Sequence, residues 1–183
     1  MPTLDPRDLT RHVDRLYRAA WALCGSRHDA EDLVQETFAR VLARPRSVRP
    51  GYELAYLLQA LRNTFISSRR GAARRPPTNG VLDEATLEDP GTRSDPGHAL
   101  EVQEVYAAIA ALPDAFRAAI VAVDVMGLSY AEASKALGVK EATITTRLFR
   151  ARSAVERDVL GDGRREGSAP SGVSAGGGPD EQP

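Results

Sequence analysis

The sequence predicts an all-α protein made of two small helical domains joined by a flexible linker. Apolar residues recur at intervals of three and four over residues 7–75 and again over residues 99–160. Between them, residues 76–98 are rich in Pro, Gly, Thr, Asp and Glu, a composition typical of a linker. The Gly-, Ser- and Pro-rich residues 161–183 have the composition of a disordered tail.

Charge is segregated along the chain, although the net charge of −1 conceals it. Every charged residue between positions 29 and 36 is acidic, and every charged residue between positions 62 and 75 is basic. Such a distribution indicates one acidic contact surface and at least one basic surface.

The single cysteine, Cys24, excludes an internal disulfide and a Cys-rich zinc site, and its apolar neighbours predict a buried thiol. Residues 1–10 lack the apolar core of a signal peptide, and no segment is apolar enough to span a bilayer. We therefore expect a cytoplasmic protein that does not insert into a membrane.

The first predicted helix is capped by Asp8 or Thr10, runs to about Cys24 and ends at Gly25. We expect Trp21 to fill the core rather than to stack on a base. The apolar residues expected on the inner face of this helix are Leu9, Val13, Leu16, Ala20 and Leu23.

The second predicted helix begins at Ser26 or His28 and continues to about Ala43. Acidic residues in its first turn favour the positive end of the helix dipole. The residues expected to be buried are Ala30, Leu33, Val34, Thr37, Phe38, Val41 and Leu42, whereas Asp29, Asp32, Gln35 and Glu36 lie on the solvent side.

The spacing His28-x-x-Glu31 is similar to half of a carboxylate-bridged metal site in a helix bundle. Such a site needs matching Glu and Glu-x-x-His ligands on neighbouring helices, and the sequence has none. We therefore predict no metal site here.

Two prolines and a glycine make residues 44–51 a basic loop, and a third helix is expected over about residues 53–70. Its inward residues are Leu54, Leu57, Leu58, Leu61, Phe65 and Ile66, and its outward residues include Tyr56, Arg62, Asn63, Arg69 and Arg70. The last two arginines could simply complement the helix C-terminus. A phosphate-binding surface explains them together with Arg74, Arg75 and the basic loop.

The second domain begins with a helix from His98 or Ala99 to Leu112, followed by a helix with Pro113 in its first turn. Ser129 and Glu132 form a capping-box pattern that starts a short helix at Tyr130. Gly138 supplies a turn, and the next helix begins at Lys140 or Glu141, with Ile144 and Leu148 facing inward. The polar residues expected on its outer faces are Thr143, Thr145, Thr146, Arg147 and Arg150. This pattern is typical of a helix-turn-helix that enters a DNA major groove.

Four motifs in this order resemble the sigma-70 family of bacterial transcription initiation factors, in its small extracytoplasmic-function (ECF) subgroup. They are Asp29-Ala-Glu-Asp-Leu-Val-Gln-Glu-Thr-Phe38, Ala111-Leu-Pro-Asp114, Gly127-Leu-Ser-Tyr-Ala-Glu132 and Thr143-Ile-Thr-Thr-Arg-Leu-Phe-Arg-Ala-Arg152. The resemblance covers roughly residues 7–75 and 99–157. It implies a sigma region 2 helix bundle at residues 7–75 and a region 4 helix-turn-helix at residues 99–160.

The resemblance also implies partners and residue roles. Asp29, Asp32, Gln35 and Glu36 would dock on the β′ clamp helices of core RNA polymerase, and the β flap is a further implied contact. The residues implied for recognition and melting of the promoter −10 element are Tyr56, Arg62, Asn63, Arg69, Arg70, Arg74 and Arg75. Those implied for the −35 element are Lys140, Thr143, Thr145, Thr146, Arg147 and Arg150. An anti-sigma factor is the implied inhibitor, and the resemblance implies no cofactor and no catalytic residue.

Several positions depart from the family pattern. Tyr56 stands where the family often has Trp, Lys140 where Pro is common, Ala142 where Gly is common, and Thr145 where a basic residue is common. The change at Thr145 should reduce either phosphate contact or guanine readout.

Two other functions fit parts of the sequence. One is a stand-alone helix-turn-helix regulator whose N-terminal domain senses or dimerises, and the other is a metalloprotein using His28 and Glu31. An acidic helix followed by a basic one favours the sigma interpretation, because a sensing domain has no need of both.

Overall fold

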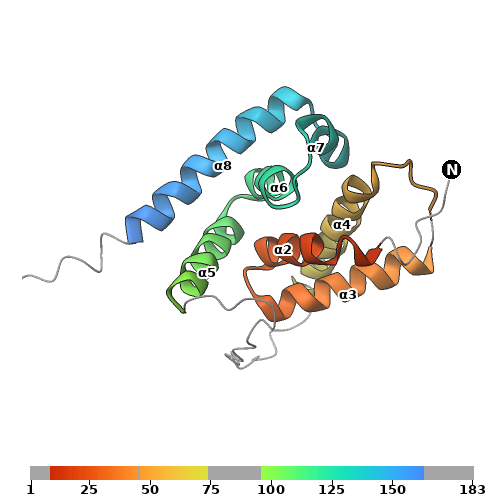
Figure 1. Ribbon diagram of the computed structural model, residues 1–183, viewed down its shortest axis with the longest axis horizontal. Coiled ribbons are helices and arrows are strands. Elements are labelled where there is room, and N and C mark those ends of the chain that lie inside the picture. The colour runs from red at the N-terminus through yellow and green to blue at the C-terminus, as the bar shows by residue number, and fades with distance from the viewer. Residues whose placement is uncertain (1–8, 45, 74–95, 163–183) are drawn as a thin grey trace, which may run out of the picture.

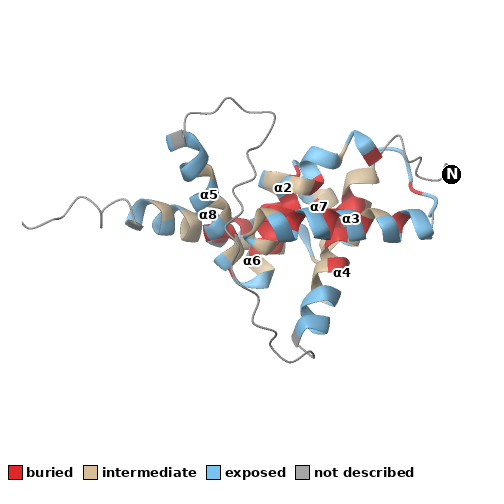
Figure 2. Cartoon of the chain, turned by 90° about the horizontal axis from the view of Figure 1, so that it is seen from below, coloured by how far each residue is buried: buried red, intermediate tan, exposed pale blue. Residues whose placement is uncertain are grey.

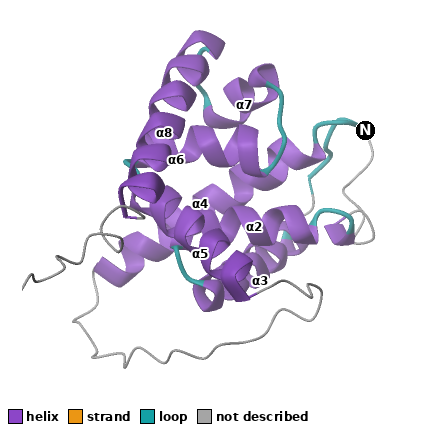
Figure 3. Cartoon of the chain, turned by 60° about the vertical axis from the view of Figure 1, so that its left-hand side comes forward, coloured by secondary structure: helices purple, strands orange, loops and turns teal. Residues whose placement is uncertain are grey.

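The computed structural model describes residues 9–44, 46–73 and 96–162, and no strand occurs within these ranges (Figures 1 and 3). The helices of the first domain are α2 (Val13–Cys24), α3 (Arg27–Ala43) and α4 (Glu53–Ala73). Those of the second are α5 (Pro96–Ala111), α6 (Asp114–Ile120), the π-helical η1 (Val121–Val125), α7 (Tyr130–Leu137) and α8 (Glu141–Asp162). Most of the predicted linker and nearly all of the predicted tail lie outside the described residues.

Helix α2 is the centre of the first domain and packs against both α3 and α4. Gly25 ends it in the left-handed conformation, with φ of 78°, as predicted. Trp21 is only 6% exposed, which confirms that it is a core residue. The start of α3 is also confirmed, because the Ser26 side chain caps it by accepting a hydrogen bond from the backbone N–H of Asp29.

The predicted cap at Thr10 is wrong, whereas the alternative cap, Asp8, lies outside the described residues. Residues 9 and 10 are helical, but a turn follows at residues 11 and 12, where the His12 N–H donates to the Leu9 carbonyl, and α2 begins only at Val13. The turn interrupts the helical phase, so Leu9 is buried while Val13 is 37% exposed.

Leu42, expected on the buried face of α3, is 46% exposed. Val41 takes the inner position in the last turn of this helix, and the next residue is rotated by about 100° toward solvent.

The second domain contains a π-helical turn that the sequence pattern does not indicate. It continues α6 without a break and places Asp124 opposite Arg152 of α8, whose Nε and Nη2 donate to the two carboxylate oxygens at 2.9 and 2.6 Å. A bidentate pair of this kind fixes α8 against the turn. Helix α5 begins about two residues before the expected start, and α8 ends about two residues after the expected end.

The helix-turn-helix forms as its local residues predict. The Ser129 side chain accepts a hydrogen bond from the Glu132 N–H, and the Glu132 carboxylate accepts from the Ser129 N–H at 2.8 Å, which completes the capping box at the start of α7. Gly138 ends α7 with φ of 66°, a conformation that glycine adopts without steric cost. Ile144 and Leu148 are fully buried.

The two domains pack directly against each other (Figure 1). Helix α2 contacts α5, α6 and η1, and α4 contacts α7. One continuous cluster of buried apolar side chains therefore runs through both domains, and Figure 2 shows buried residues gathered where they meet. No helix within the described ranges is long and apolar enough to cross a membrane.

A pair of substitutions on α2 tests this packing. Leu16 is fully buried, so Leu16→Ala should lower the free energy of unfolding by about 2–5 kcal/mol, measured by urea denaturation. Val13→Ala, the control on the same helix, should cost well under half as much. Similar losses for the two variants would contradict the observed start of α2.

The capping box gives a second stability prediction. Ser129→Ala should lower the free energy of unfolding by about 1 kcal/mol at neutral pH, while Ser67→Ala, at an exposed site within α4, should change it little.

This loss should depend on pH. Hydrogen bonds from the Ser129 hydroxyl and backbone N–H lower the pKa of Glu132, so its ionised carboxylate stabilises the fold above the ordinary pKa of a glutamate. That contribution disappears as the pH falls through the folded-state pKa, and the cost of Ser129→Ala should shrink with it. A cost that is constant from neutral to acidic pH would contradict the contribution of the carboxylate.

Candidate nucleic-acid and protein interfaces

The acidic residues of α3 form one exposed helix face. Asp29, Asp32 and Glu36 lie within about one third of the helix circumference, and Gln35 is exposed beside them. Glu36 is already engaged, because it accepts hydrogen bonds from Arg40 at 2.6 Å and from the Ser68 hydroxyl of α4 at 3.2 Å. Asp29 and Asp32 therefore carry the negative charge on this face that is available to a partner. Glu36 links α3 to α4 instead.

His28 is on the same helix, 3.9 Å from the Asp32 carboxylate, with both side chains largely exposed. No group of three His, Cys, Asp or Glu side chains is placed to hold a metal ion in the part of the chain that the structure describes.

The predicted −10 residues of α4 divide into exposed and partly covered side chains. Asn63 and Arg70 are exposed, whereas Tyr56 and Arg62 are half-buried. Arg69 forms an ion pair of 3.3 Å with Asp114, at the start of α6 in the second domain. Arg74 and Arg75, which the sequence groups with them, lie outside the described residues.

Two hydrogen bonds between Ser134 and Val139 hold the turn between α7 and α8. The Ser134 hydroxyl donates to the Val139 carbonyl at 2.5 Å, and the Ser134 carbonyl accepts from the Val139 N–H at 3.1 Å. These bonds bracket Gly138 and fix the angle at which α8 leaves α7, so the outer face of α8 is presented on a rigid support.

The predicted −35 residues lie on the accessible side of α8. Lys140, Thr145, Thr146 and Arg150 are exposed, and Thr143 and Arg147 are half-buried. The Thr145 and Thr146 hydroxyls donate to the backbone carbonyls four residues earlier, at 3.1 and 3.0 Å. In this conformation the two threonines offer their methyl groups and oxygen lone pairs to a ligand, because their hydroxyl protons are already engaged.

Phe149 was not among the predicted contact residues, yet it is the most exposed large apolar side chain among those described, at 73%. It lies one turn after Thr145, outside the buried row of Ile144 and Leu148, and that spacing could have revealed it. An exposed aromatic side chain beside hydroxyl and guanidinium groups suits apolar contact with a thymine methyl group.

Cys24, the last residue of α2, is half-buried rather than fully buried. Burial raises the pKa of its thiol to about 11, and the charge of Asp29 adds to the shift. The thiol is therefore protonated at neutral pH and a poor nucleophile.

Comparison with known proteins matches both domains to one family. The family model described as Sigma-70 region 2 matches residues 9–75, and the model described as Sigma-70, region 4 matches residues 102–155. Together these ranges cover more than half of the chain.

Curated relatives match across the linker. The ECF RNA polymerase sigma factor SigE of Mycolicibacterium smegmatis is 39% identical over 87% of this chain, which spans 62% of that relative's length. EcfG of Rhodopseudomonas palustris is 35% identical over 87% of each chain, and SigM of Bacillus subtilis is 30% identical over 79% of this chain and 88% of its own.

Solved structures show the same architecture. The sigma factor RpoE of Bartonella quintana, solved with the anti-sigma factor NepR, matches with a TM-score of 0.67 and 30% identity over 85% of this chain and 95% of its own. CnrH, solved with the cytosolic domain of CnrY, has a TM-score of 0.60 and 24% identity, over 85% and 87% of the two chains, and supports the fold alone. The order of the two regions, their helical geometry and these relatives together place the chain in the ECF group of the sigma-70 family of RNA polymerase sigma factors.

Proposed function

We propose that this chain binds core RNA polymerase and directs it to specific promoters by recognising their −10 and −35 elements. The observation that carries the proposal is the presence on one chain of an acidic α3 face, a basic α4 and a helix-turn-helix in the two sigma regions. It acts by binding, without a catalytic step of its own, and works in the cytoplasm where the polymerase and the chromosome are.

Polymerase binding is assigned to the exposed face of α3. Asp29 and Asp32 would pair with cationic side chains on the β′ clamp helices, with Gln35 supplying a neutral hydrogen-bonding group. Glu36 contributes less directly, because Arg40 and Ser68 already satisfy both of its carboxylate oxygens. The second domain would contact the β flap.

Recognition of the −10 element is assigned to α4 and the basic segments beside it. A melted promoter exposes unstacked bases and a single strand of phosphates, which aromatic and guanidinium groups bind. Tyr56, Arg62 and Asn63 would contact the bases, and Arg69, Arg70, Arg74 and Arg75 would bind the phosphates. Free energy of binding to the separated strand then favours melting.

Recognition of the −35 element is assigned to the outer face of α8. Lys140, Arg147 and Arg150 would supply charged donors to phosphates or guanine edges, and Thr143, Thr145 and Thr146 would supply methyl groups and acceptors. An anti-sigma factor is the proposed inhibitor, by analogy with the RpoE relative whose structure contains NepR.

The alternative of a stand-alone helix-turn-helix regulator loses its main support. It requires an N-terminal sensing or dimerising domain, whereas residues 9–75 match sigma-70 region 2.

Charge reversal on α3 tests the polymerase contact. Asp32→Arg should lower affinity for purified core polymerase at least about tenfold, because it replaces an attraction with a repulsion at the interface. The control, Asp158→Arg, makes the same charge change at an exposed position of α8 and should bind normally. Equal affinities of the two variants for core polymerase, measured by fluorescence anisotropy, would contradict the assignment of polymerase binding to α3.

Removal of one arginine side chain from α8 tests promoter recognition. With saturating core polymerase and a genomic fragment pool, Arg150→Ala should weaken promoter-dependent transcription about tenfold, from the loss of one charged DNA contact of about 1–3 kcal/mol.

Arg157→Ala is the matched control, because Arg157 is exposed on the same helix and its Nε donates to the Ser153 carbonyl. It should leave transcription unchanged. Equal transcription by both variants would contradict the assignment of α8, and the absence of specific transcripts from the wild type would refute the sigma function.

A further inference from the structure

Four side chains form one exposed row near the beginning of α8, which we call the outer row. Thr145 and Thr146 follow Ala142 by three and four residues, and Phe149 follows the two threonines by four and three. This spacing places all four side chains on the same face of the helix. Each of them is exposed, and the ring of Phe149 is 73% exposed. A single exposed phenylalanine would need no explanation, but a row of four such neighbours does.

Both threonines of the outer row turn their hydroxyl groups back onto α8. The Thr145 hydroxyl donates to the Glu141 carbonyl at 3.1 Å, and the Thr146 hydroxyl donates to the Ala142 carbonyl at 3.0 Å. A threonine whose hydroxyl is fixed in this way is held in one rotamer, so its Cγ2 methyl group remains at the exposed surface. The outer row therefore presents three methyl groups and the ring of Phe149.

The outer row has no proton to donate to the edge of a base. The side chains of Ala142 and Phe149 carry no polar atom, and both threonine hydroxyl protons are already used. Guanine offers only the acceptors O6 and N7 in the major groove, so the outer row cannot select it by hydrogen bonding. Thymine offers a C5-methyl group there, and alanine, threonine methyl and phenylalanine are the side-chain groups that contact it.

A charged row lies beside the outer row. Arg147 follows Thr143 by four residues and Arg150 follows Arg147 by three, on the neighbouring part of the helix circumference. Arg150 is exposed and Arg147 is half-buried. Guanidinium groups in this position can bind phosphates while the outer row lies in the groove between them. The adjacent positive charge favours DNA, rather than an apolar pocket of a protein, as the partner of the outer row.

Two residues of the outer row are positions at which this chain departs from the family pattern. Ala142 stands where Gly is common, and Thr145 stands where a basic residue is common. Each departure adds a methyl group to the outer row, and the second also removes a charged donor. The reduced phosphate contact or guanine readout expected from Thr145 is therefore accompanied by a gain in apolar surface.

We propose that α8 selects −35 elements that contain thymine, by packing the outer row against thymine C5-methyl groups in the major groove. This proposal rests on the proposed sigma function and names the base that the −35 site selects. Thr145 and Phe149 are the specificity-determining residues, and the arginines of the charged row hold the phosphates on either side.

Removal of methyl groups from the DNA tests the proposal directly, because deoxyuridine differs from thymidine only in lacking the C5-methyl group. A promoter recovered from the genomic fragment pool is rebuilt with deoxyuridine at every thymine of its −35 element. The control carries the same number of deoxyuridines upstream of that element. At a fixed salt concentration, the complex of the full-length chain with core polymerase should bind the substituted element at least about fourfold more weakly, the effect of one buried methyl group. The control should bind like the unmodified promoter.

Two substitutions at Thr145 separate the methyl group from the hydroxyl, and circular dichroism checks that both variants fold. Thr145→Ser removes the methyl group and should bind the thymine promoter about fourfold more weakly, with a smaller penalty for deoxyuridine than the wild type shows. Thr145→Val keeps a methyl group and should retain the wild type's preference for thymine over deoxyuridine. If Thr145→Ser keeps that preference and Thr145→Val loses it, the hydroxyl makes the contact and the proposal is overturned.

Phe149→Ala distinguishes a DNA contact from a protein contact. It should weaken promoter binding and reduce the penalty for deoxyuridine, while its affinity for core polymerase without DNA should equal that of the wild type. A lower affinity for polymerase alone would assign the ring to a protein interface and overturn its role here.

The outcome for the wild type separates this proposal from the sigma function. Equal binding of the thymine and deoxyuridine promoters, or a −35 element without thymine on either strand, would overturn methyl recognition and leave the sigma function intact. Absence of any specific complex or transcript would refute the sigma function, and methyl recognition with it.

Discussion

The arrangement of the whole chain depends on the burial of α2 from two sides. One side packs on α3 and α4 and the other on α5, α6 and η1. Small residues make this possible, because Ala19, Ala20 and Ala22 are completely buried and let neighbouring helices approach closely on either side. Without the second domain, the apolar surface that α2 and α4 present to Met126 would be exposed to water. The two surfaces proposed to bind DNA therefore take their relative positions in this structure from a core contact rather than from the linker.

Features that depend on neighbouring residues were predictable from the sequence. The Ser26 cap, the Ser129–Glu132 capping box and the Gly138 turn each involve residues within a few positions of one another, and all three are present. The start of α2 and the π-helical turn were not predictable from periodicity. The turn at residues 11 and 12 shifts the helical phase. In η1, Asp124 pairs with Arg152 of α8, and these two residues are 28 positions apart in sequence.

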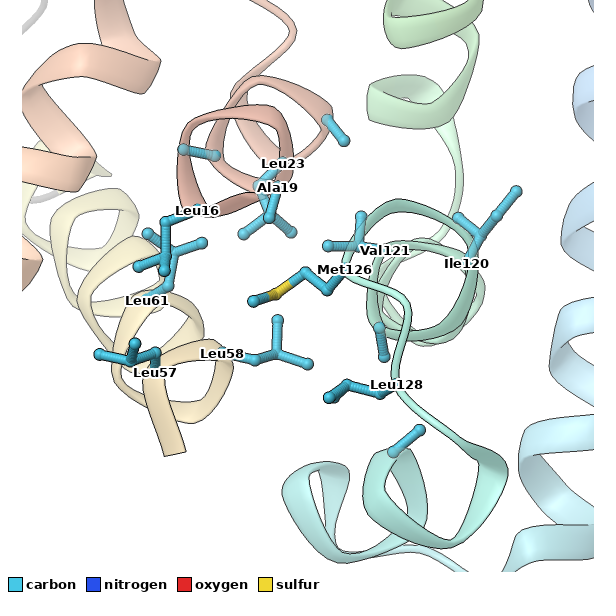
Figure 4. Close-up of a cluster of buried hydrophobic side chains, with 14 of the residues drawn as sticks. Leu16, Ala19, Leu23, Leu57, Leu58, Leu61, Ile120, Val121, Met126 and Leu128 are labelled. Carbon is cyan, nitrogen blue, oxygen red and sulfur yellow. The ribbon is translucent and has the colours of Figure 1, made fainter. Parts of the chain in front are cut away.

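The candidate surfaces also combine features that the local sequence predicts with features that it does not. Charge segregation identified the α3 and α4 faces, and helical spacing identified the outer residues of α8. Which of those side chains are already engaged depends on long-range contacts, such as Glu36 with Ser68 and Arg69 with Asp114. The sequence also treats the two domains as separate bodies, because nothing local distinguishes Met126 from a residue of its own domain's core. Its partners on α2 and α4 become evident only in three dimensions (Figure 4).

The most direct test of this account is the distance between the two domains in the free protein. In a Cys24→Ser background, the distance between spin labels at Arg15 on α2 and Arg157 on α8, both exposed, can be measured by pulsed electron paramagnetic resonance. The account predicts one short, narrow distance distribution, because the core contact fixes the two domains relative to each other. A long or broad distribution in the free protein would contradict it.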